Sequence, residues 1–359
     1  MYLDLTTEQQ DLAAGARAFL TDAYTPDVVR AAWDAGRRPE ALGLKELAEV
    51  GFLGLAVSES HGGLGLGDVE VMLILAEAGR VALPGPLLET MVAAMTIAEA
   101  GTPAQQERWL GAIVTGASLA TIALPCQPLV LDADIADVVV VCDGDDLHLV
   151  ERSGIEATPQ PAVDGARRVF TVQARTDDTT LMPGGADTTA RLRGRAALGS
   201  AAMLLGVSST LLAMTLEHVL ERRQFGRPIG SFQAIKHKLA ECHLLLEAAR
   251  PAVWSAAWLL QEGDPDMMTA VSVAKVHAVR TGRKINDEAL QCHGGVGFAW
   301  EHPLHLWLKR GKALEQAYGG AREHRRLVAE TIFDGQQGQR PPEVGGMRTA
   351  RASVPKARR

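Results

Sequence analysis

Apolar positions in the first third of the chain follow the spacing of amphipathic helices. The first such stripe recurs every three or four residues and contains Leu12, Ala16, Phe19 and Leu20. Thr7 followed by Gln10 predicts a capping box at the start of this helix. A glycine-rich segment, residues 60–67, lacks the Lys-Ser/Thr ending of a phosphate-binding loop and indicates a turn between helices. These patterns predict an N-terminal helical domain over residues 1–118.

The pattern changes to short β-branched runs near residue 120. Three runs bounded by Asp, Gly or Pro predict strands, and they cover Val138–Val141, Leu147–Val150 and Val169–Val172. We therefore expect a small β domain over residues 119–187. Long apolar stripes with helical spacing then return and predict a helical domain over residues 188–335. The expected fold is mainly α, with a small β domain between two helical domains.

Composition narrows the class of protein. The chain has 359 residues, of which 47% are hydrophobic and 22% charged, as in a globular protein with more than one packed unit. A net charge of −7, without a basic stripe that carries aromatic residues, argues against nucleic-acid binding. The four cysteines are scattered without a C-x-x-C pair, which favours reduced thiols. No apolar run reaches the ~20 residues of a membrane span, so we expect a cytoplasmic protein.

The last residues, 336–359, differ from the rest of the chain. They contain six basic residues and one acidic residue and are rich in Gly and Pro, which predicts a disordered basic tail. Elsewhere, acidic residues gather over 132–146 without the spacing of a calcium loop. His302 and His305 do not form the H-E-x-x-H pattern of zinc enzymes. We therefore predict no metal site.

Two motifs in the last third of the chain carry a family resemblance. Residues 222–233 read RRQFGRPIGSFQ, and residues 290–303 read LQCHGGVGFAWEHP. Together they resemble the C-terminal domain of the acyl-CoA dehydrogenases, FAD enzymes that desaturate acyl thioesters between Cα and Cβ. The resemblance implies a C-terminal four-helix bundle after the β domain. It also implies residues that hold the adenine and pyrophosphate half of FAD in the neighbouring subunit: Arg222, Phe225, Gln233, Gln291, Gly294 and Gly295.

The chemistry of these side chains agrees with that role. Arg222 offers a fork of donors suited to a pyrophosphate. Gly294 and Gly295 allow a ligand to approach the backbone closely. The alternative interpretation is that these positions only maintain the fold.

The family's catalytic base is not found at its usual position. Relatives carry Tyr-Glu-Gly-Thr after an E-x-P corner, and counting from Glu301 in this chain places Tyr318 where the Glu should be. Tyrosine, with a pKa of about 10, is a poor base at neutral pH. The second base position used by relatives falls on residues 195–197, which include no acid. We therefore assign no catalytic residue. Glu315 and Glu323 lie on either side of Tyr318, and we expect both to be exposed charges on helices.

The β domain is also shorter than the resemblance leads one to expect. Relatives place a Trp-x-Thr against the flavin ring, and the matching positions here are Leu129 and Leu131. Because leucine cannot donate a hydrogen bond to flavin N5, we expect this chain's own ring site to be deficient.

The sequence keeps the residues expected to contact FAD and lacks the base, and in this it resembles one kind of family member. The base-less subunit of α2β2 acyl-CoA dehydrogenases of steroid side-chain degradation has this combination. The first hypothesis is such a subunit, which completes the FAD site of a base-bearing paralogous chain, with an acyl-CoA substrate and electron-transfer flavoprotein or another flavin acceptor. The alternatives are a complete homomeric dehydrogenase with an unusual base, and a flavin-free acyl-CoA-binding or interaction protein.

Overall fold

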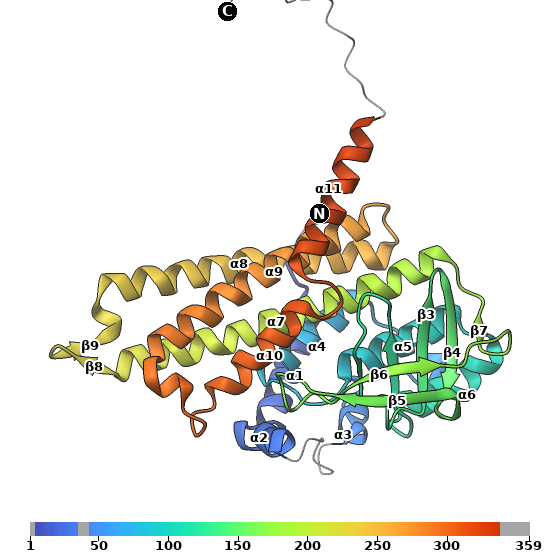
Figure 1. Cartoon of the computed structure of the whole chain (residues 1–359), viewed down its shortest axis with the longest axis horizontal. Coiled ribbons are helices and arrows are strands. Elements are labelled where there is room, and N and C mark those ends of the chain that lie inside the picture. Colours follow the sequence, from blue (N-terminus) through green and yellow to red (C-terminus); the bar gives the residue numbers. More distant parts are fainter. Residues whose placement is uncertain (1–3, 35–42, 338–359) are drawn as a thin grey trace, which may run out of the picture.

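The computed structural model describes residues 4–34 and 43–337. Long helices form an elongated body, and a β region lies against one end of it (Figure 1). The predicted basic tail lies, beyond Gln337, outside the described residues. The fold is mainly α with a small β region between two helical parts, as the sequence predicts.

The described residues of the N-terminal part form helices joined by turns. Its helices are α1 (Thr7–Ala23), α2 (Pro26–Asp34), α3 (Leu44–Glu49), α4 (Asp68–Arg80), α5 (Leu87–Ala100) and α6 (Pro103–Val114). The capping box of α1 is formed by Thr6 and Gln9, so the prediction of Thr7 and Gln10 is wrong by one residue. The Gln9 amide donates to Thr6 Oγ1 at 3.2 Å, and the Thr6 amide donates to Gln9 Oε1 at 3.0 Å. Both residue types are doubled here, so the pattern fits two registers.

The β region contains two small sheets. The strands are β1 (Ala120–Ala123), β2 (Val130–Leu131), β3 (Val138–Asp143), β4 (Asp146–Glu151), β5 (Ile155–Gln160), β6 (Val169–Ala174) and β7 (Leu181–Met182). One sheet has the order β1-β3-β4-β7, in which β1 and β3 are parallel, and the other has the order β2-β6-β5. The three predicted strands correspond to β3, β4 and β6. The Thr90 hydroxyl of α5 donates to the Ala120 carbonyl at 2.8 Å and ties the first sheet to the helical body.

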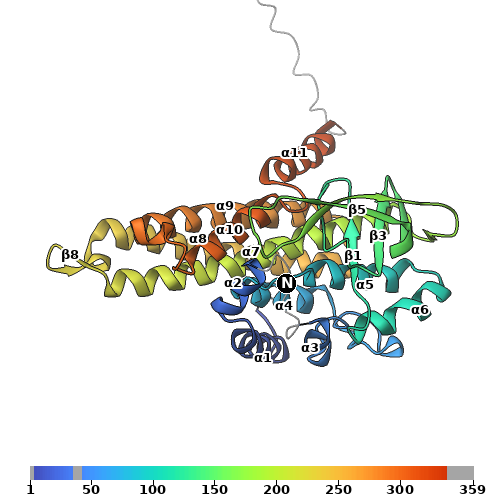
Figure 2. The same ribbon diagram turned by 60° about the horizontal axis from the view of Figure 1, so that its bottom comes forward.

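The C-terminal part consists of long helices that pack side by side. They are α7 (Ala186–Glu221), α8 (Gln233–Glu262), α9 (Met267–His293), α10 (Leu304–Gln316) and α11 (Ala321–Gln337). A short hairpin of β8 (Arg223–Gln224) and β9 (Arg227–Pro228) joins α7 to α8 and lies at the far tip of the body (Figure 1). Figure 2 shows that α11 projects away from this body.

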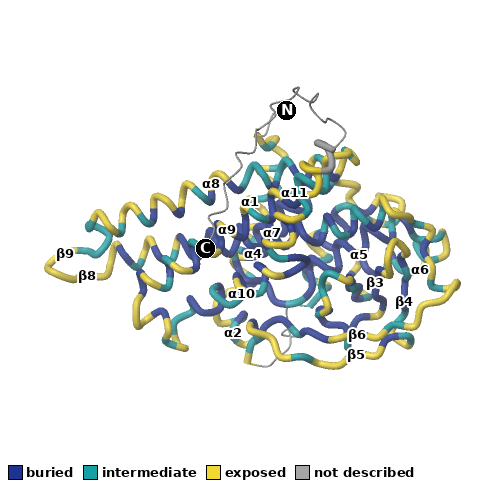
Figure 3. The backbone as a smooth tube through the Cα atoms, turned by 45° about the horizontal axis from the view of Figure 1, so that its top comes forward, coloured by how far each residue is buried: buried dark blue, intermediate teal, exposed yellow. Residues whose placement is uncertain are grey.

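Helix α7 is the centre of the core. By length and composition it is the one helix in the described ranges that is apolar enough to cross a membrane, but most of that window is buried against other helices. Glycines permit the crossing with α4: a Cβ at Gly206 would lie 1.9 Å from the Ala76 carbonyl oxygen, and one at Gly79 would lie 2.0 Å from that of Met203. Figure 3 shows the buried middle of this body and the exposed β8–β9 tip.

Candidate functional site

The two sequence motifs meet at the tip of the helical body. Arg222 directly follows α7, and Gly294 directly follows α9. One turn before Arg222, the ring of His218 stacks on that of His293, with centroids 4.3 Å apart. Close to the same end, Lys238 of α8 donates to Glu288 of α9 at 2.7 Å. The ends of three helices that carry the motifs therefore lie together.

All six residues predicted to hold the dinucleotide are exposed in this chain: Arg222, Phe225, Gln233, Gln291, Gly294 and Gly295. Phe225 is the extreme case, because 91% of it is accessible and its φ of +53° places it in the left-handed region. Such a conformation is uncommon for a bulky residue. Within the described part of the chain, the side chains of Gln233 and Gln291 form no hydrogen bond.

The geometry of the tip fits a phosphate-bearing group. Within residues 4–34 and 43–337, the Arg222 guanidinium has no hydrogen-bond or ion-pair partner, so its donors are available. Gly294 has a φ of +58°, and no atom lies within 4 Å of a Cβ built on Gly294 or Gly295. The backbone is therefore open to close approach by a ligand.

The rings of three histidines, His218, His293 and His302, pack in a row beside the two motifs at the tip. His218 stacks on His293, and the ring of His293 meets that of His302 edge to face at 5.1 Å. Nδ1 of His293 donates to the Ala289 carbonyl at 2.8 Å. Burial lowers the pKa of His218, His293 and His302, and repulsion between neighbouring rings lowers the pKa of His218 and His302 further. The three rings are therefore neutral at pH 7. In the sequence, the only indication of this row was that His293 and His302 lie close to the glycine turn.

Tyr318 lies in the buried turn between α10 and α11. Its hydroxyl donates to Glu89 Oε1 at 2.6 Å, and its amide donates to Gln127 Oε1 at 3.1 Å. Its carbonyl accepts from His324 Nε2 at 3.2 Å. Burial, together with the Glu89 carboxylate, raises the pKa of Tyr318 well above its usual value. The phenol therefore keeps its proton and does not act as a base.

The carboxylate beside Tyr318 comes from α5, and sequence reasoning missed it. Glu89 is 2% exposed and also accepts from the Arg167 guanidinium at 3.4 Å. The available signal was a single acid in the otherwise uncharged segment 81–98. An acid that is buried in such a helix needs a partner, and here Tyr318 and Arg167 provide it.

A buried lysine fixes the backbone of the same turn. Lys275 donates to Ser200 Oγ at 2.5 Å and to the carbonyls of Leu314 and Ala317 at 2.9 Å each. Burial lowers the pKa of Lys275 to about 7. These carbonyls belong to the end of α10, which has no further helical partners for them. The lysine therefore holds the chain in place directly before Tyr318.

The two acids on either side of Tyr318, Glu315 and Glu323, have different environments. Glu315 is buried and paired with Arg283 at 2.7 Å and Lys312 at 3.1 Å, so its expected exposure is wrong. It lies on the side of α10 that faces α9, where the guanidinium of Arg283 balances its charge. Glu323 is exposed, as predicted.

An apolar pocket of about 400 Å³ lies between the β region and α10. Leu129 and Leu131, the positions matched to the flavin-ring contacts, both line this pocket. Leucine side chains carry no donor, so neither position can hydrogen-bond a flavin ring. The residues at the tip thus fit the phosphate half of FAD, whereas Leu129 and Leu131 do not fit the ring half.

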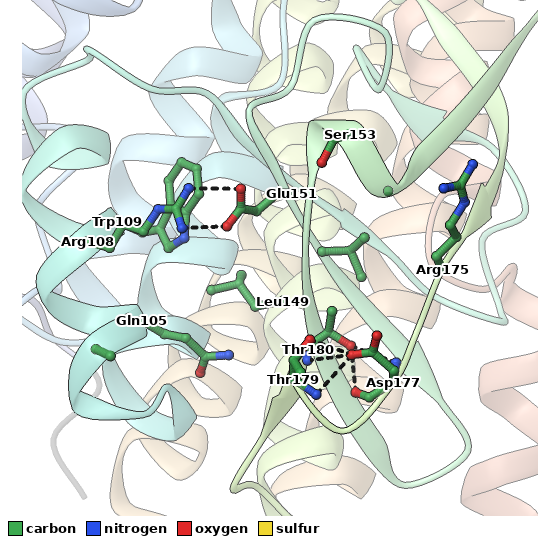
Figure 4. A pocket seen from close by; sticks show the side chains of 13 residues that line it. Gln105, Arg108, Trp109, Leu149, Glu151, Ser153, Arg175, Asp177, Thr179 and Thr180 are labelled. Atoms are coloured by element: carbon green, nitrogen blue, oxygen red, sulfur yellow. Dashed lines mark hydrogen bonds and ion pairs between the residues drawn. The ribbon is translucent and has the colours of Figure 1, made fainter.

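Polar side chains elsewhere in the described chain form local pairs. A pocket of about 420 Å³ between α6 and β4 contains Arg108, whose guanidinium pairs with Glu151 at 2.6 Å (Figure 4). On its other side, Asp177 accepts from Thr179 Oγ1 at 2.6 Å. In the acidic segment over 132–146, Asp132 pairs with Arg168 at 3.5 Å. In the ranges that the structure covers, no group of three or more His, Cys, Asp or Glu side chains is placed to bind a metal ion.

Comparison with known proteins shows two family matches and several full-length relatives. Residues 6–117 match the acyl-CoA dehydrogenase N-terminal domain, and residues 186–333 match the acyl-CoA dehydrogenase C-terminal domain. The chain is 31% identical to the acyl-CoA dehydrogenase IpdE2 of Mycolicibacterium smegmatis, over 91% of this chain and all of the relative. It is 32% identical to IpdE2 of Mycobacterium tuberculosis, over 91% of this chain and 98% of the relative.

Solved structures agree with these matches over nearly the whole chain. A chain of the Tcur3481-Tcur3483 steroid ACAD G363A variant superposes with a TM-score of 0.83 at 30% identity and covers 92% of this chain and 99% of its own. A chain of the ChsE4-ChsE5 complex from Mycobacterium tuberculosis gives a TM-score of 0.84 at 27% identity and covers 95% of this chain and all of its own. With both helical parts matched and the motifs assembled at the tip, this chain belongs to the acyl-CoA dehydrogenase family.

Proposed function

We propose that this chain is a subunit that completes the FAD site of a base-bearing paralogous partner. The complex desaturates an acyl-CoA, and we propose a steroid side-chain CoA thioester as its substrate class. FAD is the cofactor of this family. One observation carries the proposal: the residues that we propose to bind the phosphates are exposed at one end of the chain, whereas Tyr318, at the proposed base position, is buried and donates a hydroxyl hydrogen bond to Glu89.

The chemistry of desaturation explains why the two subunits would contribute different residues. A base must remove the α-proton of the thioester, and a flavin, when bound, supplies the hydride acceptor for the β-hydrogen. In this chain Tyr318 keeps its proton, and Leu129 and Leu131 give a flavin ring no hydrogen bond. Arg222 and the open backbone at Gly294 can bind the phosphates of a cofactor whose ring lies in the partner. This chain therefore contributes binding and orientation, and the partner contributes the base.

The names of similar structures support a heteromeric assembly and a steroid substrate. ChsE4-ChsE5 is a complex, and Tcur3481-Tcur3483 is a steroid ACAD with two named components. We propose that this chain likewise pairs with a paralogous subunit in the cytoplasm. Electron-transfer flavoprotein or another flavin acceptor would then reoxidise the complex.

Co-expression with an adjacent acyl-CoA dehydrogenase-like gene tests the proposal. We expect the purified pair to be yellow with stoichiometric FAD, and the chain alone to be nearly colourless. An absorbance spectrum with and without acyl-CoA gives the result. Stoichiometric flavin that bleaches with acyl-CoA in the lone chain would show a complete homomeric enzyme. Colourless protein with every paralogous partner would instead favour an acyl-CoA-binding or interaction protein.

A further inference from the structure

The apolar pocket between the β region and α10 is open to solvent and contains a buried arginine. Its volume of about 400 Å³ is in the range of small-molecule sites. Val163 and Lys312 line the pocket and are exposed, so a ligand can enter from the surface. The apolar part of the lining comes from both sides and contains Pro128, Leu129, Leu131, Val163, Val169 and Ala313. The pocket therefore favours a ligand with an apolar body.

Arg167 is the buried cation of this pocket. The residue is 9% exposed, and its guanidinium carries more N–H donors than any other side chain. Within the described chain, its one side-chain hydrogen bond goes to Glu89 Oε1, at 3.4 Å. The same oxygen accepts a shorter bond from the Tyr318 hydroxyl, at 2.6 Å. Arg167 thus retains donors for an acceptor that enters the pocket.

Lys312 adds a second cation at the rim of the pocket. Its side chain is 44% exposed and pairs with Glu315 at 3.1 Å, whereas Arg283 lies closer to Glu315, at 2.7 Å. The one carboxylate among the lining residues, Asp164, is already paired with the buried Arg310. The charge that is free to meet a ligand here is therefore positive, and the matching ligand group is an anion.

We propose that this pocket binds a compact apolar carboxylic acid in its free, ionised form, with the carboxylate on Arg167 and the apolar body against Leu129 and Leu131. The planar fork of a guanidinium matches the two oxygens of a carboxylate. A CoA thioester has no charge at its carbonyl, so Arg167 favours the free acid over the thioester. The site shares no residue with the set at the tip that is predicted to hold FAD. It requires neither FAD nor a partner chain and goes beyond the proposed function.

Cys126 provides a reporter inside the pocket. It lines the pocket and is half-buried, whereas Cys142, Cys242 and Cys292 are buried. Labelling of Cys126 by N-ethylmaleimide in the purified lone chain is followed by peptide mass spectrometry at increasing concentrations of octanoate. We expect saturable protection by octanoate, and octanamide, its neutral analogue, should require about ten- to a hundredfold higher concentration. Equal protection by both probes, or none by octanoate, would overturn the proposal.

Substitutions in the Glu89–Arg167 pair should have opposite effects. Glu89→Gln removes the carboxylate that competes for Arg167, so octanoate should bind more tightly. The double variant Glu89→Gln/Arg167→Gln leaves no uncompensated buried charge and should bind octanoate no better than octanamide. Arg168→Gln is the control and should change neither probe, because Arg168 pairs with Asp132 and Asp134 and does not line this pocket. Unchanged octanoate binding in the folded double variant would assign binding to the apolar lining alone, against the proposal.

Lys312→Gln keeps the test available if the buried variants do not fold, since Lys312 is exposed. It should weaken octanoate about two- to fivefold and leave octanamide unchanged. An equal effect on both probes, or on neither, would show that charge does not select the ligand and would contradict the proposal.

Octanoyl-CoA distinguishes the free acid from its thioester. In the wild-type chain it should protect Cys126 no better than octanamide does. Protection as strong as that by octanoate would reveal a site for the acyl chain alone and would overturn the proposal. Because these measurements use the lone chain without FAD, their failure is distinguishable from failure of the proposed function.

Discussion

The hydroxyl of Tyr318 donates a hydrogen bond of 2.6 Å to Glu89, a residue 229 positions earlier in the chain. The contact joins the turn after α10 to α5 in a place where both side chains are buried. The contact makes Tyr318, the residue that we expect at the base position, a structural link between two helical segments.

Replacing Tyr318 by Phe should destabilise the protein by about 1–3 kcal/mol, because the buried Glu89 carboxylate loses its short donor. Chemical denaturation monitored by circular dichroism measures the free energy of unfolding. The same replacement in a Glu89→Gln background is the control, and it should cost less, since a neutral acceptor makes a weaker hydrogen bond. Equal costs in both backgrounds would show that the carboxylate charge is unimportant to this bond.

Replacing Tyr318 by Glu should not create a dehydrogenase. The new carboxylate faces Glu89, and two buried carboxylates in contact repel each other when both are ionised. This repulsion grows as the pH rises, so the variant should be less stable at pH 8 than at pH 5. Adding Glu89→Gln should remove most of this pH dependence.

Activity of the Tyr318→Glu variant is measured in the heteromeric complex whose partner has lost its own base. We expect no acyl-CoA-dependent flavin reduction, because Leu129 and Leu131 still offer a ring no hydrogen bond. Turnover comparable to the intact partner site would show that the missing carboxylate is the only defect.

Replacing Arg222 by Ala in the complex should weaken FAD binding. A charge-assisted bond to a phosphate contributes about 1.5–3 kcal/mol, which corresponds to roughly ten- to a hundredfold in affinity. Flavin fluorescence during dilution gives the dissociation constant. Arg223→Ala is the neighbouring control, since Arg223 is also exposed but lies in β8 outside the predicted set. Equal effects of the two replacements would mean that only the overall positive charge of the tip matters.

The histidine row should make the tip sensitive to acid. The folded pKa values of His218, His293 and His302 are lowered below the unfolded value of about 6.5. Between these values the unfolded chain binds more protons, so stability is lost as the pH falls through about 6.5. Arg222, which faces His218, adds to the repulsion once a ring is protonated.

Exchange of residues 214–224 and 288–300, corrected for intrinsic rates, should therefore be faster at pH 5.5 than at pH 7.5. His218→Gln should reduce this difference, whereas His277→Gln, at an exposed position of α9, should not. A pH response that is the same in both variants would contradict a role for the row.

Local sequence signals predicted the elements whose residues are neighbours in the chain. The long helices and strands β3, β4 and β6 follow from runs of apolar or β-branched residues. Strands β1, β2 and β7 are too short to carry such a pattern, and β5 reads IEATPQ, in which polar residues break the run. The exposed motif residues at the tip were found for the same reason, since each motif is contiguous.

The buried cluster could not be predicted in this way. Glu89, Arg167 and Tyr318 belong to three segments that only the tertiary fold brings together. Glu315 was expected to be exposed, because helix periodicity alone does not show which neighbour covers a charged side chain. Its burial depends on Arg283 from α9.

Helix α7 spans 36 residues, and its middle and its C-terminal end contact different parts of the molecule. Ser200, which accepts from the buried Lys275, and His218, at the tip, are separated by about 27 Å along the helix at 1.5 Å per residue. At this distance, substitutions at the two positions have nearly additive effects on stability. Substitutions can therefore accumulate in the interior of the protein without compensating changes at the tip.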